Sequence, residues 1–156
     1  MNNDQNISIQ FDCDTDSDVD LQNLEALIRS VCWEFDVSEA DIQIRIVNDA
    51  GIIEVHQKFL KKNTTTDVIS FDLSDEFETA RSFQLIVNAD MAHREALKRG
   101  HTTNAELALY ITHGMLHQLG YDDLEPEQAR LMHEKEDTIL QNNGFGIIYY
   151  KQETKE

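Results

Sequence analysis

The residues that could do chemistry are concentrated in one segment, HGMLHQLGYDD at positions 113–123. His113 and His117 are four residues apart, so on a helix both imidazoles project from the same face. This spacing suits two ligands of a single divalent ion. Gly120 follows at the place where such a helix would end, because glycine adopts the left-handed conformation cheaply. The chain can then turn back and bring a third ligand to the two histidines.

Asp123 is the third ligand that we expect. The spacing His-x3-His-x2-Gly-x2-Asp matches in register the HExxHxxGxxH pattern of the metzincins, which places the ligand at Asp123. Three protein ligands and an open fourth position are typical of catalytic zinc, so the sequence predicts one Zn²⁺ per chain. Zinc proteases carry their general-base glutamate at the position of Gly114, which argues against proteolysis. No catalytic base is identified.

Composition narrows the class of protein. The 156 residues are 40% hydrophobic and 28% charged, which is typical of one globular domain. No apolar stretch approaches the roughly 18 residues that a membrane helix needs. The start, MNNDQNISIQ, lacks the basic and apolar regions of a secretory signal. Cys13 and Cys32 are too few for a disulfide framework, so we expect reduced thiols and a cytoplasmic location.

Hydrophobic periodicity predicts four strands and five helices. The strands are expected at 7–11, 42–46, 68–73 and 84–87. The helices are expected at 24–35, 49–59, 89–99, 103–119 and 126–143. Their order predicts an α+β fold over residues 1–150: a small mixed four-stranded sheet, about five helices and a zincin-like metal helix. Residues 151–156 are expected to form a flexible tail.

Capping residues and aromatic positions add detail to this prediction. Asp18 or Asp20 can cap the first helix, Asn48-Asp49 the second, and Asn88 or Asp90 the third. Thr103-x-x-Glu106 matches a capping box for the fourth helix. The core is expected to include Trp33, Phe35 and Tyr110.

Other polar residues have weaker signals. Surface or capping roles are expected for His56, His93, His101 and His133, which have no ligand-like spacing. Asp67 and Ser70 could support the metal site from the neighbouring strand or make hydrogen bonds at the strand edge, and the sequence leaves both open.

The formal net charge is −17, from 13 Lys and Arg against 30 Asp and Glu. Such a chain is a poor generic binder of nucleic acid, because phosphates attract Lys and Arg. Two segments are nevertheless poor in acids: 56–62 holds three lysines and no acid, and 93–101 holds three basic residues against one glutamate. They could form a local basic surface, or simply be scattered solvated charges.

Two signatures resemble one family. HGMLHQLGYDD is similar to HGxLHLxGYDH of the YbeY family of bacterial endoribonucleases, and Thr65–Phe71, TTDVISF, is similar to that family's PTDVLSF. The resemblance runs from about Ile7 to Tyr150. It implies a zinc-dependent endoribonuclease that is specific for single strands and acts in 16S rRNA 3′-end maturation and ribosome quality control. It also implies ribosomal RNA as partner, small-subunit proteins as further candidates, and no membrane.

The chain departs from the family pattern at three places. Asp123 stands where the family has its third histidine ligand, although carboxylates are legitimate zinc ligands. Leu60 stands where members carry a functional arginine, so Lys61, Lys62 and Arg94 are expected to contact RNA phosphates. Phe83-Gln84 replaces a Gly-Asp pair. Two alternatives to the nuclease remain: a non-catalytic ribosome-associated assembly factor, and a metalloprotease, which only the metal spacing favours.

Overall fold

The computed structural model describes residues 5–15, 19–77 and 80–146. The strands are β1 (Asn6–Cys13), β2 (Glu39–Val47), β3 (Val68–Asp72) and β4 (Arg81–Asn88). The helices are α1 (Leu21–Glu34), α2 (Asp49–Leu60), α3 (Ala89–Arg99), α4 (Thr103–Gln118) and α5 (Pro126–Asn142). The predicted α+β fold with a mixed four-stranded sheet is confirmed. The expected tail at 151–156 and the candidate cap Asp18 lie outside the described residues.

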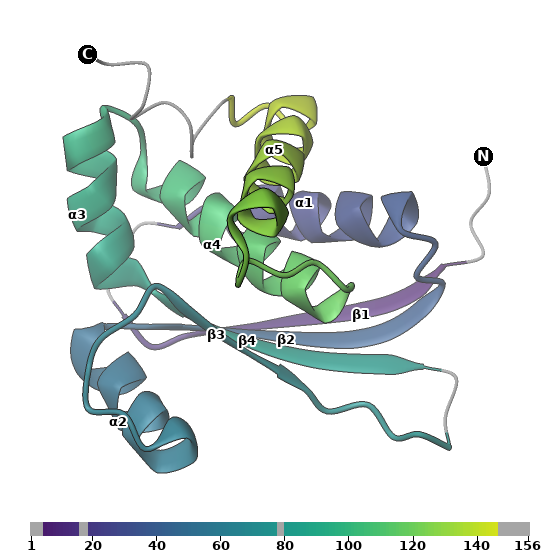
Figure 1. Cartoon of the computed structure of the whole chain (residues 1–156), viewed down its shortest axis with the longest axis horizontal. Coiled ribbons are helices and arrows are strands. Elements are labelled where there is room, and N and C mark those ends of the chain that lie inside the picture. The colour runs from purple at the N-terminus through teal and green to yellow at the C-terminus, as the bar shows by residue number, and fades with distance from the viewer. Residues whose placement is uncertain (1–4, 16–18, 78–79, 147–156) are drawn as a thin grey trace.

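The sheet has the strand order β1-β2-β4-β3 (Figure 1). β1, β2 and β4 are parallel, and β3 runs antiparallel along β4 as an edge strand. β4 is longer than its expected span of 84–87, because it is hydrogen-bonded on both sides, to β2 and to β3. The expected span of four residues misses both ends, including Phe83, which is fully buried.

Helices cover the two faces of the sheet unequally. α1 and α4 pack on one face with α5 beyond them, whereas α2 lies against the other (Figure 1). The main core forms on the α1 and α4 side, where the alternate residues Ile42, Ile44 and Ile46 of β2 point. A smaller core forms beneath α2 from five residues: Val47, Ile52, Val55, Ile69 and Ile86. At the edge of the sheet formed by β3, α4 lies on one face and α2 on the other.

Most of the predicted caps are present, with one displaced. Asp20, Asn48 and Asn88 cap α1, α2 and α3 through their side-chain oxygens. The capping box at Thr103 is wrong: Thr102 is the cap and accepts from the backbone N–H of Ala105 at 3.1 Å. Two adjacent threonines make such a shift easy, because either can supply the cap.

Trp33 is expected in the core and is instead 61% exposed. The buried stripe of α1 runs through Leu24, Leu27, Ile28, Val31 and Cys32. Trp33 follows Cys32 by one residue, which turns it about 100° away from that stripe. The other two expected core aromatics are inside: Tyr110 is buried, and Phe35 packs partly buried against the core.

Gly114 lets α4 lie close to the sheet. A Cβ placed there would come within 2.9 Å of Leu85 Cδ2 and 3.3 Å of Val68 Cγ2. Leu85 is fully buried, so it has little room to move. This position faces the sheet, and a glutamate there, as in zinc proteases, would not fit without repacking the core. This close packing sets the distance at which His113 and His117 of α4 are held from β3 and β4.

Gly114→Ala is therefore expected to destabilise the fold. In an open helix the same change stabilises by up to about 1 kcal/mol, because alanine is the better helix former. Here overpacking costs about 1–3 kcal/mol, so we expect a net loss of about 1 kcal/mol in the free energy of unfolding. Urea denaturation monitored by circular dichroism measures it. A gain in stability would show that the helix is not tightly packed at this point.

No helix in the described part of the chain is both long and apolar enough to cross a bilayer.

Candidate metal centre

His113 and His117 lie on one face of α4, one turn apart. Their Nε2 atoms are 3.2 Å apart, and the ring centroids are separated by 4.7 Å. The side chains are 20% and 32% exposed, although most of the residues around them on α4 are buried. The predicted pairing of the two imidazoles is thus present at the solvent-facing end of a central helix.

The chain reverses just after α4, as the glycine predicted. Gly120 has φ +105°, and the N–H of Tyr121 bonds back to the carbonyl of Leu116 at 2.9 Å. The ring of Tyr121 packs edge-on against Phe35 near the end of α1, with centroids 6.1 Å apart. This aromatic contact anchors the return segment, so the next two residues are held beside the histidines.

Asp123 completes a triangle of donor atoms. Its Oδ2 lies 3.6 Å from His113 Nε2 and 3.7 Å from His117 Nε2. A tetrahedral ion with bonds of about 2.0–2.1 Å requires ligand atoms about 3.3 Å apart. The three separations therefore fit one small divalent ion with a fourth position open to solvent. Asp122 has another role, because its Oδ1 accepts from the N–H of Asp123 at 2.7 Å and orders the loop.

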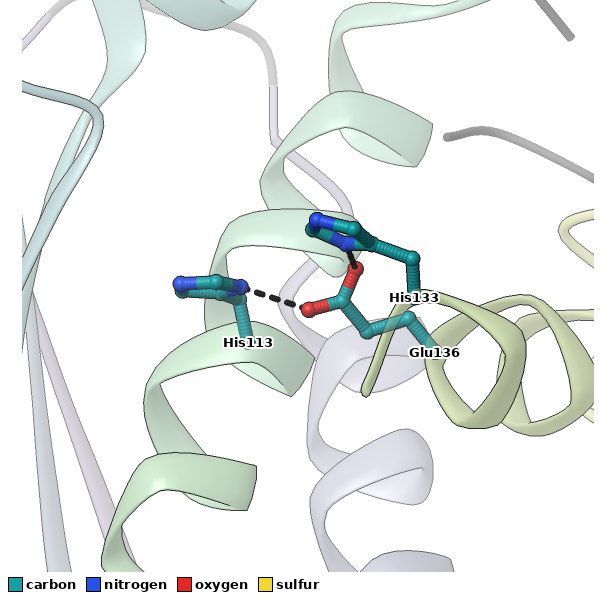
Figure 2. Close-up of side chains that lie close together, drawn as sticks. All are labelled: His113, His133 and Glu136. Atoms are coloured by element: carbon teal, nitrogen blue, oxygen red, sulfur yellow. Dashed lines mark hydrogen bonds and ion pairs between the residues drawn. The ribbon is translucent and has the colours of Figure 1, made fainter. Parts of the chain in front are cut away.

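Glu136 on α5 holds the first histidine from behind. Its carboxylate lies between two imidazoles: His113 Nδ1 is 2.5 Å from Oε2, and His133 Nδ1 is 2.9 Å from Oε1 (Figure 2). His113, His133 and Glu136 could also be considered as a ligand set of their own. Their contacts of 2.5 and 2.9 Å are hydrogen bonds and are shorter than the about 3.3 Å that separates two ligands of one tetrahedral ion, so the triangle with Asp123 fits an ion better. Glu136 instead fixes His113 so that Nε2 points at the triangle.

Hydrogen bonds outweigh burial in setting the pKa values of Glu136 and His113. Burial alone would raise the pKa of Glu136, but the hydrogen bonds from His113 and His133 outweigh it and lower that pKa below its usual range. Burial lowers the pKa of His113, but the bond to Glu136 and the nearby carboxylates of Asp67 and Asp123 leave it raised. Because its pKa is raised, His113 binds a proton more readily, and protons therefore compete with a metal ion for this residue.

Sequence reasoning missed Glu136 and His133. The expectation of a surface or capping role for His133 is wrong: it is only 15% exposed and bonded to Glu136. A signal was present in α5, where Met132, Glu136, Ile139 and Leu140 share the buried stripe. An acid within an apolar stripe needs a partner, and that requirement points to a buried cation or imidazole.

Glu136→Gln is expected to weaken zinc binding by about 10–100-fold, the usual effect of losing such an outer partner. An amide can accept from only one of the two imidazoles and presents an N–H₂ group to the other. Competition with a chromophoric chelator measures the affinity. Glu134→Gln is the matched control, since Glu134 lies on the same helix, is exposed and pairs with Arg130. Parental affinity in Glu136→Gln would contradict the orienting role.

The last turn of α4 is fastened to the sheet. Gln118 Nε2 donates to Ser70 Oγ of β3 at 2.9 Å, and Arg81 donates to the carbonyl of Gln118 at 2.8 Å. Ser70 thus supports the end of the metal helix through a strand-edge hydrogen bond. Asp67 accepts from the N–H of Val68 at 2.7 Å and adds its charge near His113, so both roles left open for it hold in part.

A polar junction joins the TTDVISF segment to α2 and α3. Asn88, fully buried, donates to Asp49 Oδ1 at 2.8 Å and to Thr65 Oγ1 at 3.0 Å. Arg94 donates to both oxygens of Asp49, at 2.7 and 3.1 Å. The hydrogen bond from Arg94 lowers the pKa of Asp49 to about 2. The guanidinium of Arg94, which was expected to contact RNA, is therefore already paired with a carboxylate.

The other residues expected to contact RNA lie just after α2. Lys61 has a left-handed backbone, with φ 57°, and ends the helix. Lys61 and Lys62 are both exposed. They follow α2, whereas the two histidines belong to α4, and these helices lie on opposite faces of the sheet (Figure 1). The structure thus does not bring the lysines into the triangle of metal ligands.

The remaining histidines have structural roles. His93 is exposed, with Nδ1 3.3 Å from Thr103 Oγ1, as expected of a surface residue. His56 is buried, with Nδ1 2.7 Å from the carbonyl of Thr64. His101 is also nearly buried and pairs with Glu106, so the surface expectation is wrong for these two.

Comparison with known proteins identifies the family of this chain. The family model described as "Endoribonuclease YbeY" matches residues 9–144. The proteins of that name from Lysinibacillus sphaericus and Bacillus velezensis are 35% and 31% identical. The alignments cover 69% and 80% of this chain, and 75% and 87% of the relatives. The solution structure of a Thermotoga maritima protein, 23% identical, has the same fold with a TM-score of 0.60 over 88% of each chain.

The two signatures that carry the resemblance have distinct structural roles. HGMLHQLGYDD forms the end of α4 and the return loop, and supplies all three donor atoms. TTDVISF forms the approach to β3 and the strand itself, and supports α4 through Ser70. Together with the family match over most of its length, they show that this chain belongs to the YbeY family of endoribonucleases.

Proposed function

We propose that the protein is a zinc-dependent endoribonuclease, specific for single strands, that acts in the cytoplasm. We further propose the 3′ end of 16S rRNA as its substrate and a role in ribosome quality control, with small-subunit proteins as partners. The observation that carries the proposal is the triangle of His113, His117 and Asp123, with separations of 3.2–3.7 Å. It occurs in a chain of the YbeY family, with one face open to solvent.

Residues around the metal ligands prepare the site for chemistry. Glu136 holds the proton of His113 on Nδ1, which leaves Nε2 as a neutral ligand. Asp122 orders the loop that presents Asp123. Zinc bound to the three would polarise a phosphodiester oxygen and lower the pKa of a water ligand toward about 7. The general base, and the choice between water and the RNA 2′-OH as attacking group, are not assigned.

The route of the RNA is proposed from charge. The protein is strongly acidic, so RNA must approach over the few places where cations are exposed. Lys61 and Lys62 provide such a place at the edge of the sheet marked by β3. A strand that crosses this edge would have phosphates on the lysines and continue toward the metal centre. Arg94, shared with Asp49, is a weaker contact in this proposal.

One experiment separates the nuclease from its two alternatives. The zinc-loaded protein is incubated with single-stranded RNA, duplex RNA and casein, each with and without chelator. The nuclease cuts only the single strand, and chelator stops it. A non-catalytic factor binds RNA and cuts nothing, while a protease cuts casein. Gly114, packed against Leu85, already argues against the protease because the usual position of its base is closed.

Lys61→Ala combined with Lys62→Ala is expected to weaken RNA binding and flatten its salt dependence. For a single strand, each lysine that no longer neutralises a phosphate should reduce the slope of log K against log salt by about 0.7. Fluorescence anisotropy with chelator-treated protein at several salt concentrations measures the slope. Arg45→Ala is a control, because that arginine is a cation of β2 that pairs with Asp14 and lies outside the cleft beside the metal centre. An unchanged slope in the double variant would mean that phosphates are held elsewhere.

A further inference from the structure

A cleft of about 190 Å³ lies beside the metal centre and shares His113 with it. Part of its wall is apolar and comes from Met91, Leu109 and Tyr110 of α3 and α4. The cleft is open on one side, so it can be entered from solvent. A cavity of about 150 Å³ is enough to hold benzene. The space therefore suits a single planar ring system.

Asp67 brings a partly exposed carboxylate to this cleft. Its Oδ1 already accepts from the N–H of Val68 at 2.7 Å and from Thr66 Oγ1 at 3.3 Å. Within the described residues, no side chain donates to its Oδ2. The residue is only partly exposed, so this oxygen lacks the full hydration of a surface carboxylate. A ligand with a hydrogen-bond donor would meet that need.

Arg99 and Glu95 of α3 add charged side chains to the lining of the cleft. Glu106, fully buried, accepts two bonds of 3.2 Å from Arg99 Nη1 and so fixes the guanidinium in place. Arg99 Nη2 lies 3.8 Å from Glu95 Oε1. Besides Glu136, which is bonded to the two histidines, the cleft thus offers the carboxylates of Asp67 and Glu95, the latter accepting from Lys98 at 3.2 Å, and an immobilised guanidinium. Such a mixture of ring-sized space and fixed polar groups is typical of a specificity pocket.

We propose that this cleft binds a nucleobase that carries an exocyclic amino group: adenine, cytosine or guanine. Carboxylates accept hydrogen bonds from such amino groups. Uracil offers a single N–H between two carbonyl oxygens, which Asp67 and Glu95 repel. Because His113 borders both sites, a base in the cleft places its own phosphodiester beside the metal ligands. This inference rests on the proposed nuclease function and gives it a base preference.

Binding of four oligonucleotides tests the pocket without any cleavage. Each is a short oligouridine with one central nucleotide, which is A, C, G or U, and the full chain is treated with chelator. The strand can slide, so the single amino-bearing base finds the cleft. We expect at least about fivefold tighter binding of the A, C or G strand than of all-uridine, as for one specific base contact. Fluorescence anisotropy gives the dissociation constants.

Two variants and a control assign the preference. Asp67→Asn and Glu95→Gln are each expected to reduce the gap in affinity, which is the ratio of the dissociation constant of all-uridine to that of the amino-bearing strands. Asp41→Asn removes the same charge from an exposed position on β2 and should keep the gap. Equal binding of all four strands by the parent protein overturns the proposal, and so does a gap that persists in both variants. If Asp67→Asn does not fold, Glu95→Gln decides alone.

The same strands separate this inference from the nuclease proposal. With zinc added, cleavage of all four at equal rates would support the nuclease and contradict the pocket. No cleavage of any strand would contradict the nuclease, while the gap in binding would still report on the cleft.

Discussion

His117→Ala is expected to lose more than about 100-fold in zinc affinity, together with RNA cleavage. Removing a residue that only supports a metal ligand lowers metal affinity by about 10–100-fold. His117→Ala removes a ligand atom itself, so we expect a larger loss. The two remaining donors, His113 Nε2 and Asp123 Oδ2, are 3.6 Å apart and hold an ion poorly. The fold should persist, because the His117 side chain is 32% exposed. Elemental analysis and an RNA cleavage assay measure the two losses.

His133→Ala is the matched comparison for His117→Ala. His133 belongs to the alternative set with His113 and Glu136, and it contacts the centre by its bond to Glu136 and by stacking on the ring of His113, without supplying an atom to the triangle. It should therefore lose less zinc affinity than His117→Ala. If His133→Ala is the more damaging of the two, the metal is held by the buried set and the triangle of donors is wrong.

Asp123→Ala is expected to be about as damaging as His117→Ala, and far worse than Asp122→Asn. Asp123 Oδ2 is within 3.7 Å of both histidine nitrogens, whereas Asp122 acts on the backbone of its neighbour. Asp122→Asn keeps an oxygen that can accept from the same N–H, so the loop should stay ordered. Zinc titration of the two variants side by side gives the comparison. Full zinc occupancy and full activity in Asp123→Ala would exclude it as the third ligand.

Asp123→His extends this test to the charge of the centre. Two neutral imidazoles and one carboxylate leave a divalent ion at a formal charge of +1, and three imidazoles leave it at +2. The more positive centre acidifies water and attracts phosphate more strongly. We therefore expect Asp123→His to retain zinc and to shift the alkaline rise of RNA cleavage to lower pH. A shift to higher pH, or none, would contradict this account of the charge.

The fold was largely predictable because its signals are local. Alternation marks β2 as Ile42, Ile44 and Ile46, and all three are buried in the main core. Non-local features were harder to predict. The full length of β4 depends on hydrogen-bonded partners on both sides and is not encoded by the residues adjacent in sequence. The exposure of Trp33, by contrast, follows from its position beside the apolar stripe of α1, so its expected burial neglected a local signal.

The candidate site also combines residues that local sequence predicts with residues that only tertiary packing brings together. His113, His117 and Asp123 lie within eleven residues, so helical spacing and one glycine bring them together. Glu136 lies 23 residues from His113 and reaches it only because α5 packs on α4. The cleft beside the metal centre likewise requires residues of three helices and the approach to β3. Contacts of this kind follow from tertiary packing and not from spacing.

The most direct test of the account is to titrate zinc into chelator-treated protein and to measure cleavage of single-stranded RNA at each step. If one ion at the triangle carries the activity, cleavage should rise in proportion to bound zinc and reach its plateau at one zinc per chain. Activity that is complete without metal, or that appears only after a second ion has bound, would contradict it.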